Sequence, residues 1–349
     1  MNVLVTGGAG YIGSHVCMEL LQNNHNVTVV DNLQNSTKDN LLNVSKLSGK
    51  DLSFNSTSDK FSFYEFDLKD NLMLRNLFSK NKIHAIIHCA GFKSPEESQK
   101  IPLDYFDNNV TSSISLFQEA LRADVRTVIF SSSASVYGVP DTLPIKEEFA
   151  TGSIVNSYAR TKLIIEEILF DMHSAYKDLN IICLRYFNPV GSHSSGLIGD
   201  NPKNHPNNLM PRINNVILGK QQKLKIYGND YNTRDGTGIR DYIHIVDLAK
   251  GHRKALSYLK DKTSTFDIIN LGRGKGTSVL EMIHVYEESS GETIPIEFDL
   301  RREGDIEESW ADVKKAKELL GWEAKFDLHD ICRDNWRWLK TISKNSAEL

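Results

Sequence analysis

The stretch Val3-Leu-Val-Thr-Gly-Gly-Ala-Gly-Tyr-Ile-Gly13 decides the fold class of this 349-residue chain. A short apolar run ends in a glycine-rich turn, and a helical pattern opens directly after it. Glycines let the backbone turn tightly and let a diphosphate approach bare amides at the N-terminus of a helix. The stretch therefore predicts the first unit of a dinucleotide-binding fold, with Gly7, Gly10 and Gly13 beside the phosphates.

Short apolar and β-branched runs recur through the first half of the chain and alternate with amphipathic stretches. This alternation indicates a parallel sheet with helices on both faces, a Rossmann-type doubly wound α/β fold. The expected strands cover residues 3–6, 27–30, 61–66, 85–88, 127–131 and 181–185. The polar residues 49–60 are interpreted as a surface loop before the third of these strands.

Two long helical patterns have apolar residues spaced three and four apart. One spans residues 103–121, and the other begins near Tyr158. Their apolar faces are expected to cover the sheet, and a surplus face predicts a homodimer contact made by two helices of each subunit. The apolar positions are Leu103, Phe106, Val110, Ile114, Phe117 and Leu121 in the first pattern and Ile165, Ile168, Leu169 and Met172 in the second.

Asp31 ends the second expected strand, where a carboxylate accepts hydrogen bonds from the adenosine ribose of a bound dinucleotide. The same carboxylate repels a 2′-phosphate, and the next basic residue along the chain is Lys38. The cofactor is therefore predicted to be NAD rather than NADP.

Tyr158 and Lys162 are four residues apart, so they share one face of the second helix. A free tyrosine has a pKa of about 10, and bringing it to about 7 takes roughly 4 kcal/mol. One cation about 4 Å away supplies a similar amount at an effective dielectric constant of about 20. Ser133 ends a strand-like run, where such sheets present groups to a ligand. We therefore predict that Ser133, Tyr158 and Lys162 form an acid/base group; Tyr258 and Lys262 have the same spacing without this context.

Composition is that of an ordinary globular protein, with 40% hydrophobic residues, 25% charged residues and a net charge of −4. Binding to nucleic acid or to a membrane gains no support, because there is no basic excess and the longest apolar runs are too short to span a bilayer. The strand pattern that follows Met1 leaves no room for a signal peptide. The four cysteines are scattered along the chain: Cys17, Cys89, Cys183 and Cys332. Because they lack the spacing of zinc ligands, we expect reduced thiols and no bound metal. Reduced thiols in turn indicate a cytoplasmic enzyme.

Motifs that run nearly end to end resemble those of nucleotide-sugar 4-epimerases in the extended short-chain dehydrogenase/reductase family. Besides residues 3–15 they are Asp31-Asn-Leu, His88-Cys-Ala-Gly-Phe-Lys93, Phe130-Ser-Ser-Ser-Ala-Ser-Val-Tyr-Gly138, Leu184-Arg-Tyr-Phe-Asn-Pro-Val-Gly191, Pro206-Asn-Asn-Leu-Met-Pro211, Asp235-Gly-Thr-Gly-Ile-Arg-Asp-Tyr-Ile-His244 and Arg301-Arg-Glu-Gly-Asp305. The last four are specific to sugar-nucleotide epimerases. The resemblance implies NAD-dependent, reversible 4-epimerisation of UDP-galactose and UDP-glucose through a 4-keto sugar, with Tyr158 removing the proton of the 4-hydroxyl.

The same resemblance implies which residues contact each ligand. Beside Ser133, Tyr158 and Lys162, the NAD contacts are Gly7, Gly10, Tyr11, Ile12, Gly13, Asp31, Asn32, Asn35, Ser36, Asp67, Leu68, Ala90, Gly91, Lys93, Asn108 and Phe187. The UDP-sugar contacts are Asn188, Asn208, Leu209, Tyr227, Arg240, Arg302, Asp305 and Ser309. Two arginines suit a diphosphate because they make bidentate hydrogen bonds and keep their charge.

The amino-acid composition of the chain changes after Asn188. Residues 189–211 are rich in Gly, Pro, Asn and His, and this composition predicts a loop region that shapes a ligand site. We expect an NAD-binding Rossmann domain over residues 1–188 and a smaller mixed α/β nucleotide-sugar-binding domain over residues 189–349. Residues 241–248 are a segment that can return to the first domain.

Other activities stay open. A 4,6-dehydratase or a nucleotide-sugar decarboxylase shares the fold and the Tyr-Lys pair but carries carboxylates directly after the serine, where this chain has Ala134 and Ser135. No sequence feature excludes a dehydrogenase that releases its reduced cofactor. A noncatalytic NAD-sensing protein is disfavoured because Ser133, Tyr158 and Lys162 are all intact.

Three departures from the family pattern bear on function. The segment Asn156-Ser-Tyr-Ala-Arg-Thr-Lys162 lacks the proline and glycine that usually flank the catalytic tyrosine. The segment Lys93-Ser-Pro-Glu-Glu-Ser98 puts a proline and an extra acid near the nicotinamide. Ser309 stands where members restricted to glucose and galactose often carry a tyrosine. Because the smaller side chain opens room for a 2-acetamido group, we hypothesise that UDP-GalNAc and UDP-GlcNAc are also interconverted.

Overall fold

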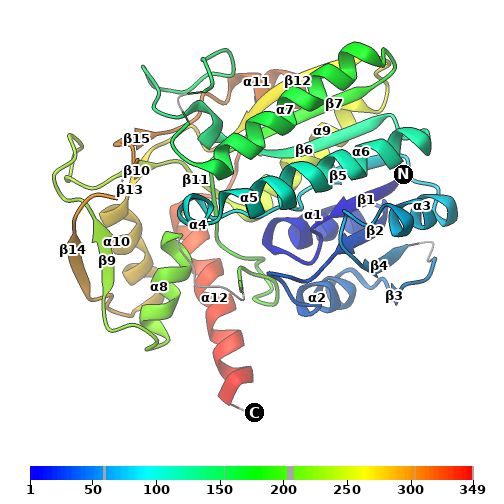
Figure 1. Ribbon diagram of the computed structural model, residues 1–349. Helices are drawn as coiled ribbons and strands as arrows, with labels where there is room; N and C mark the ends of the chain where they lie inside the picture. Colours follow the sequence, from blue (N-terminus) through cyan, green and yellow to red (C-terminus); the bar gives the residue numbers. More distant parts are fainter. Residues whose placement is uncertain (58–59, 153, 203–207, 303, 348–349) are drawn as a thin grey trace.

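The computed structural model describes residues 1–57, 60–152, 154–202, 208–302 and 304–347 (Figure 1). Its centre is an eight-stranded parallel sheet with the strand order β12-β7-β6-β5-β1-β2-β4-β3. The strands are β1 (Asn2–Thr6), β2 (Asn26–Asp31), β3 (Leu52–Phe54), β4 (Phe61–Glu65), β5 (Ala85–His88), β6 (Thr127–Ser133), β7 (Asn180–Tyr186) and β12 (Thr265–Leu271). The chain reverses its direction of sheet growth between β1 and β5, and ligands bind beyond the carboxyl ends of the strands at such a switch point.

All six predicted strands are confirmed to within a few residues. The interpretation of residues 49–60 as a loop is wrong in part, because β3 lies within it and pairs in parallel with β4, Leu52 opposite Phe61. A three-residue edge strand is too short to carry a readable alternation of apolar and polar residues.

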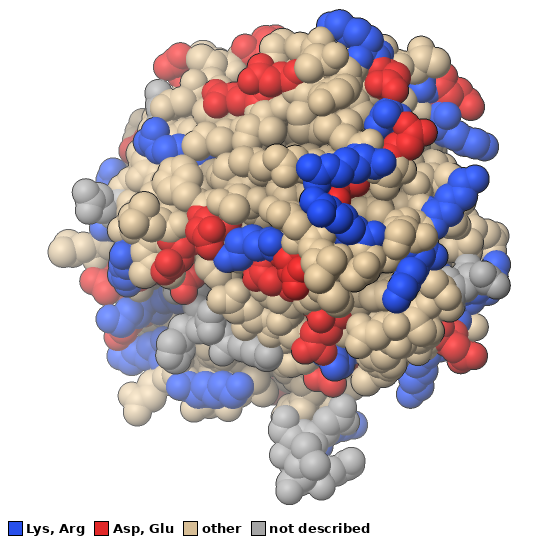
Figure 2. Space-filling model, turned by 45° about the vertical axis from the view of Figure 1, so that its right-hand side comes forward, with Lys and Arg blue, Asp and Glu red and all other residues tan. Residues whose placement is uncertain are grey.

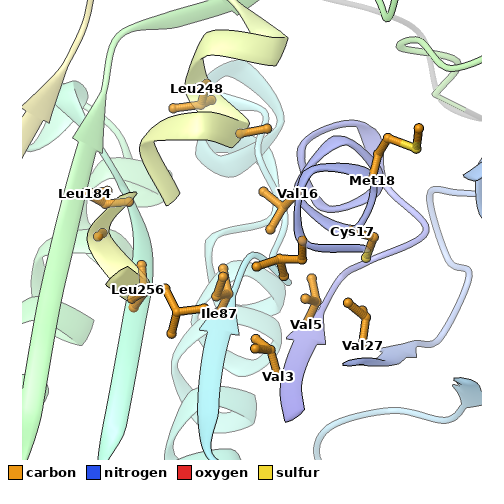
Figure 3. Packing of buried hydrophobic residues seen from close by; sticks show 14 of the residues in the cluster. Val3, Val5, Val16, Cys17, Met18, Val27, Ile87, Leu184, Leu248 and Leu256 are labelled. Atoms are coloured by element: carbon orange, nitrogen blue, oxygen red, sulfur yellow. The ribbon is translucent and has the colours of Figure 1, made fainter. Parts of the chain in front are cut away.

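Helices cover both faces of the sheet. On one face lie α1 (Tyr11–Gln22), α2 (Asp39–Ser48) and α9 (Ile245–Leu259), and their apolar residues pack on β1, β2, β5 and β7. Figure 3 shows part of this core, with Val3 and Val5 of β1 beneath Val16 of α1 and Leu256 of α9 nearby. Full burial of one such aliphatic side chain contributes about 1.5–3 kcal/mol.

The other face carries α3 (Asn71–Lys80), α6 (Ser112–Arg122) and α7 (Ser157–Ala175). The helix predicted over residues 103–121 is not continuous: α5 (Pro102–Tyr105) leads into a π-helical turn (Phe106–Thr111) and then into α6. Leu103 is 79% exposed, so the expectation that it covers the sheet is wrong, whereas Phe117 packs on the sheet as expected. π turns of this kind often occur at functional sites.

Most of the remaining elements lie at the carboxyl end of the large sheet, whereas α11 (Lys314–Leu320) packs on α9 and β12 (Figure 1). They form small sheets, two of which pair β8 with β11 and β9 with β14, while β10 lies between β13 and β15. The strands are β8 (Asn188–Val190), β9 (Leu224–Tyr227), β10 (Ile239–Arg240), β11 (Tyr242–His244), β13 (Thr277–Ser278), β14 (Ile296–Asp299) and β15 (Glu308–Ser309). The helices are α4 (Pro95–Lys100), α8 (Leu209–Ile217), α10 (Val279–Ser290), α11 (Lys314–Leu320) and α12 (Leu328–Ala347).

Acidic and basic side chains are interspersed over the face in Figure 2. None of the helices within the described residues is both long and apolar enough to cross a membrane.

Candidate active site

The glycine-rich turn after β1 has a conformation that only glycine fits well. Gly7 has a φ of 68°, and a Cβ there would lie 2.7 Å from the backbone of Ala90. A Cβ on Gly13 would lie 2.2 Å from the carbonyl oxygen of Gly7. Gly10 caps α1 without a side-chain hydrogen bond, so the first amides of the helix are available to an anion.

Asp31, at the end of β2, is bound into the same turn. Its carboxylate accepts hydrogen bonds from the backbone amides of Ala9 at 3.0 Å and Leu33 at 2.9 Å and from the hydroxyl of Ser36 at 3.1 Å. Burial raises the pKa of Asp31, and these hydrogen bonds lower it in part. The acid therefore holds the turn and stands beside the cavity described next.

A cavity of about 450 Å³ lies against the glycine-rich turn. Its lining contains all the predicted cofactor residues except Ser133 and Phe187. Tyr158 and Lys162 are in the same lining, so the predicted acid/base pair and the predicted phosphate-binding turn share one space. Phe187 lies apart, in a small apolar cluster with Val136 and Ile145.

Tyr158 is 7% exposed. The hydroxyl of Ser133, its predicted partner, forms a hydrogen bond of 2.6 Å with the Ser135 hydroxyl. Burial raises the pKa of Tyr158, and the Ser133 side chain lowers it in part. The Lys162 ammonium donates to the Ser131 carbonyl at 2.9 Å and lies 4.9 Å from the centre of the Phe130 ring. Burial lowers the pKa of Lys162 to about 8. The side chain that lowers the pKa of Tyr158 in the structure is that of Ser133. The role that the sequence assigned to the Lys162 charge stays a prediction.

The second pair, Tyr258 and Lys262, has a different setting. The Tyr258 hydroxyl donates to Asp267 at 3.4 Å, and the Lys262 ammonium lies 4.7 Å from the Tyr258 ring centre. Burial and the Asp267 carboxylate both raise the pKa of Tyr258. This pair has a structural role at the end of α9, which makes it a natural control.

Ser133→Ala is expected to lower turnover near neutral pH by about 10- to 100-fold, because hydrogen bonds to charged groups contribute about 1.5–3 kcal/mol. Without the group that lowers the pKa of Tyr158, the basic form appears only at higher pH. The acid limb of the kcat/KM profile should therefore move to higher pH. Ser133→Thr keeps the hydroxyl and should restore the profile; an alanine profile that superimposes on the wild type would refute this role.

On the predicted substrate side, two arginines lie close to the ring of Tyr227. The guanidinium carbons of Arg302 and Arg212 are 4.0 Å and 5.0 Å from the centre of its ring. Arg302 is a predicted substrate residue and Arg212 is not, although it follows the predicted Leu209 by three positions on α8. Two stacked guanidinium groups on one aromatic ring form a cationic surface suited to an anion.

A second group of predicted substrate residues consists of Arg240, Asp305 and Ser309. Arg240 Nη2 forms an ion pair with Asp305 Oδ1 at 3.0 Å, and Arg240 lies opposite Ser309 in the parallel register of β10 and β15. The Asp305 amide donates to the Arg302 carbonyl at 3.2 Å. The two arginines predicted to hold a diphosphate are thus joined through one turn.

A second cavity of about 1110 Å³ adjoins the first and shares Lys93 and Asn108 with it. Its lining includes the predicted substrate residue Asn208, at the start of α8. Glu96, the extra acid of the unusual 93–98 segment, lines this second cavity. A hydrogen bond from Lys100 lowers the pKa of Glu96, and the charges of Arg302 and Arg212 add to the effect.

The predicted substrate residue Asn188 is exposed. Its backbone amide donates a hydrogen bond to the Asp241 carbonyl at 2.9 Å.

The model of the NAD dependent epimerase/dehydratase family matches residues 3–272. A UDP-glucose 4-epimerase of Bacillus subtilis is 49% identical over 97% of this chain and 96% of its own length. The chain belongs to this family. It is similar to a UDP-glucose 4-epimerase from Stenotrophomonas maltophila with bound NAD and formylated UDP-arabinopyranose, with a TM-score of 0.93, 44% identity and 99% of each chain covered. It is also similar to the enzyme from Bifidobacterium longum in complex with NAD+ and UDP, with a TM-score of 0.92, 42% identity and 98% of each chain covered.

For a member of this family, the candidate residues named from the sequence omit two segments that line the cofactor cavity. One lies within residues 189–211, which the sequence predicted as a ligand-shaping loop region without naming contact residues between β8 and Asn208, and the other is α12. The apolar spacing of Ile331, Trp338 and Ile342 predicts a buried helix face, but nothing local indicates that this face meets the cavity. From these segments the lining takes Gly196, Leu197, Asp200, Asn201, Pro202, Trp338, Thr341 and Ile342.

Proposed function

We propose that this chain catalyses the NAD-dependent, reversible interconversion of UDP-galactose and UDP-glucose by inversion at carbon 4 of the sugar. One observation carries the proposal: Tyr158 and Lys162 line the same cavity as the glycine-rich turn. A proton-transfer group thus stands where a nicotinamide cofactor and a sugar hydroxyl can meet.

The residues of the first cavity fit NAD. The glycine-rich turn offers amides to the diphosphate, and the Asp31 carboxylate stands where an adenosine ribose is bound in such folds. Bound NAD+ supplies reversible hydride exchange with carbon 4 and a positive charge beside the phenol.

Tyr158 holds and moves the proton. Its phenol oxygen accepts the proton of the 4-hydroxyl and returns one to that oxygen after the other face of the sugar has been presented. The Ser133 side chain favours the basic form of Tyr158, because it lowers the pKa of the phenol in part. Lys162 carries its charge below a pH of about 8. Its ammonium is held by the Ser131 carbonyl near the end of β6, and it lines the same cavity as Tyr158.

Arg240 and Arg302 bind the diphosphate of the substrate. Both guanidinium groups stay charged at every working pH, and the turn that ends at Asp305 holds them together. Binding energy concentrated on UDP leaves the sugar ring free to turn over, which a redox-neutral inversion requires.

We further propose that the enzyme converts UDP-GalNAc and UDP-GlcNAc. Ser309, which is 9% exposed, lies beside Arg240 in the sheet register. A hydroxymethyl side chain there leaves space for the 2-acetamido group. Dehydration is disfavoured, because Ala134 and Ser135 follow Ser133 and no carboxylate stands in those two positions.

Three structural proposals accompany the function. A homodimer is supported by exposed apolar side chains on α5, α6 and α7, namely Leu103, Ile114 and Phe170. A cytoplasmic location is supported by four free cysteines in the described residues. A cofactor domain of residues 1–188 together with 245–271 is supported by α9, which packs on α1, and by β12 at the edge of the large sheet.

The test is a product assay with protein purified without added NAD. UDP-galactose and UDP-GalNAc are incubated in parallel and the products are separated by chromatography. Conversion of both to their 4-epimers is expected. Conversion of UDP-galactose alone removes the wider substrate range, and no conversion of either, even with NAD supplied, would contradict the proposed reaction.

A further inference from the structure

Residues 191–202, here named the strap, run along one side of the cofactor cavity after β8. The Tyr11 hydroxyl donates to the Gly191 carbonyl at 2.6 Å and so fixes the start of the strap to the first turn of α1. Near the other end, Lys93 forms an ion pair with Asp200 at 3.2 Å. Both ends of the strap are therefore tied to residues that line the cofactor cavity.

The strap also contacts the C-terminal helix α12. Arg337 Nη1 donates to the Ser194 carbonyl at 2.5 Å. A Cβ on Gly199 would lie 2.5 Å from the Trp338 ring, so the strap backbone lies directly against the indole. Trp338 is 4% exposed and lines both cavities.

Two further contacts hold the strap and α12 in place. From α2, the Asn43 side chain donates to the Leu197 carbonyl at 2.9 Å. From α12, Asp334 Oδ2 lies 3.4 Å from His244 Nε2, and both side chains are buried. The strap is thus held between α2 on one side and an anchored α12 on the other.

We propose that α12 is a clamp for the cofactor, in which Arg337 and Trp338 hold the strap closed over NAD between turnovers. Arg337 lines neither cavity and is a positioning residue, since it acts through the strap, whereas Trp338 both contacts the strap and lines the cavity. The inference rests on the proposed function, because a redox-neutral cycle regenerates NAD in place and gains from keeping it bound. Cofactor release is then controlled by two elements that are far apart in the sequence. One is the glycine-rich turn, and the other is α12.

Loosening the clamp should weaken NAD binding without changing the chemistry of the acid/base group. If the closed strap falls from nearly full population to about one tenth, the apparent affinity for NAD falls about tenfold. Arg337→Met and Trp338→Ala are each expected to raise the dissociation constant and the release rate of NAD by about this factor. In Arg337→Met, whose altered side chain lines neither cavity, affinity for UDP should stay near that of the wild type.

The experiment compares the wild type, both clamp variants and a control, Lys340→Met, all purified without added NAD. Lys340 is exposed on α12, and its ammonium lies 5.2 Å from the Trp336 ring, away from the strap contacts. Bound NAD is quantified after exhaustive dialysis, and NAD and UDP binding are then titrated by calorimetry. We expect the clamp variants to lose NAD and to recover it when NAD is added, while the control keeps it.

The possible outcomes separate the clamp from the proposed function. Clamp variants that retain NAD like the wild type would overturn the clamp. A wild type that binds no NAD at all would count against the proposed function instead. If Trp338→Ala also loses UDP binding, Arg337→Met decides, because the side chain of Arg337 is 47% exposed, so that its replacement disturbs packing less than loss of the buried indole. Arg337→Met also removes the 3.5 Å ion pair with Asp334 of the same helix.

Discussion

Tyr158→Phe is expected to lower kcat by a factor on the order of 10² to 10⁴, the range typical of a positioned acid/base group. The substitution removes one oxygen atom and keeps the buried ring, so packing is preserved. NAD content should not change, because the glycine-rich turn and Asp31 are untouched. Turnover of UDP-galactose and bound NAD are measured on the same preparation.

Tyr258→Phe is the matched control for this loss. It removes the same atom from a tyrosine that also precedes a lysine by four residues, but whose hydroxyl contacts Asp267. Wild-type turnover is expected for the control. Near-normal turnover of Tyr158→Phe, or an equal loss in both variants, would remove Tyr158 from its role.

Ser309→Tyr is expected to reduce kcat/KM for UDP-GalNAc by roughly 100-fold while UDP-galactose keeps most of its rate, since discrimination of this order follows from filling a pocket. The larger side chain would occupy the space beside Arg240 that we assign to the 2-acetamido group. Both substrates are assayed on one preparation, so that turnover of UDP-galactose reports an intact fold.

Ser309→Ala serves as the control for the selectivity change. It keeps the side chain small, so both substrates should be turned over at a ratio close to that of the wild type. The proposed substrate range would be wrong if the wild type converts no UDP-GalNAc. It would also be wrong if the ratio of the two rates is the same with tyrosine as with serine at position 309.

The regular part of the fold could be predicted from the sequence because its signals are local. The apolar runs that became β1, β2, β5 and β7 are flanked by helical patterns, and that alternation determines a parallel sheet. The short β3 and the π-helical turn at Phe106–Thr111 could not be predicted. The first depends on an edge pairing with β4, and the second changes the helical period within an otherwise regular apolar pattern.

The same distinction applies to the site. The glycine-rich turn, Asp31 and the Tyr-Lys pair are each readable within a few residues, because spacing along one element determines their geometry. The contributions of the strap and α12 depend on contacts between segments more than a hundred residues apart, such as that of Arg337 with Ser194. Likewise, no local pattern shows that the Lys162 ammonium donates to the Ser131 carbonyl.

The central claim is that hydrogen leaves carbon 4 of the sugar and returns to the same carbon within one pocket. The most direct measurement uses UDP-galactose labelled with deuterium at carbon 4, purified protein, ordinary water and no added NAD. The expected product is UDP-glucose that keeps the deuterium at carbon 4. A product that carries hydrogen from water at carbon 4 would contradict the account.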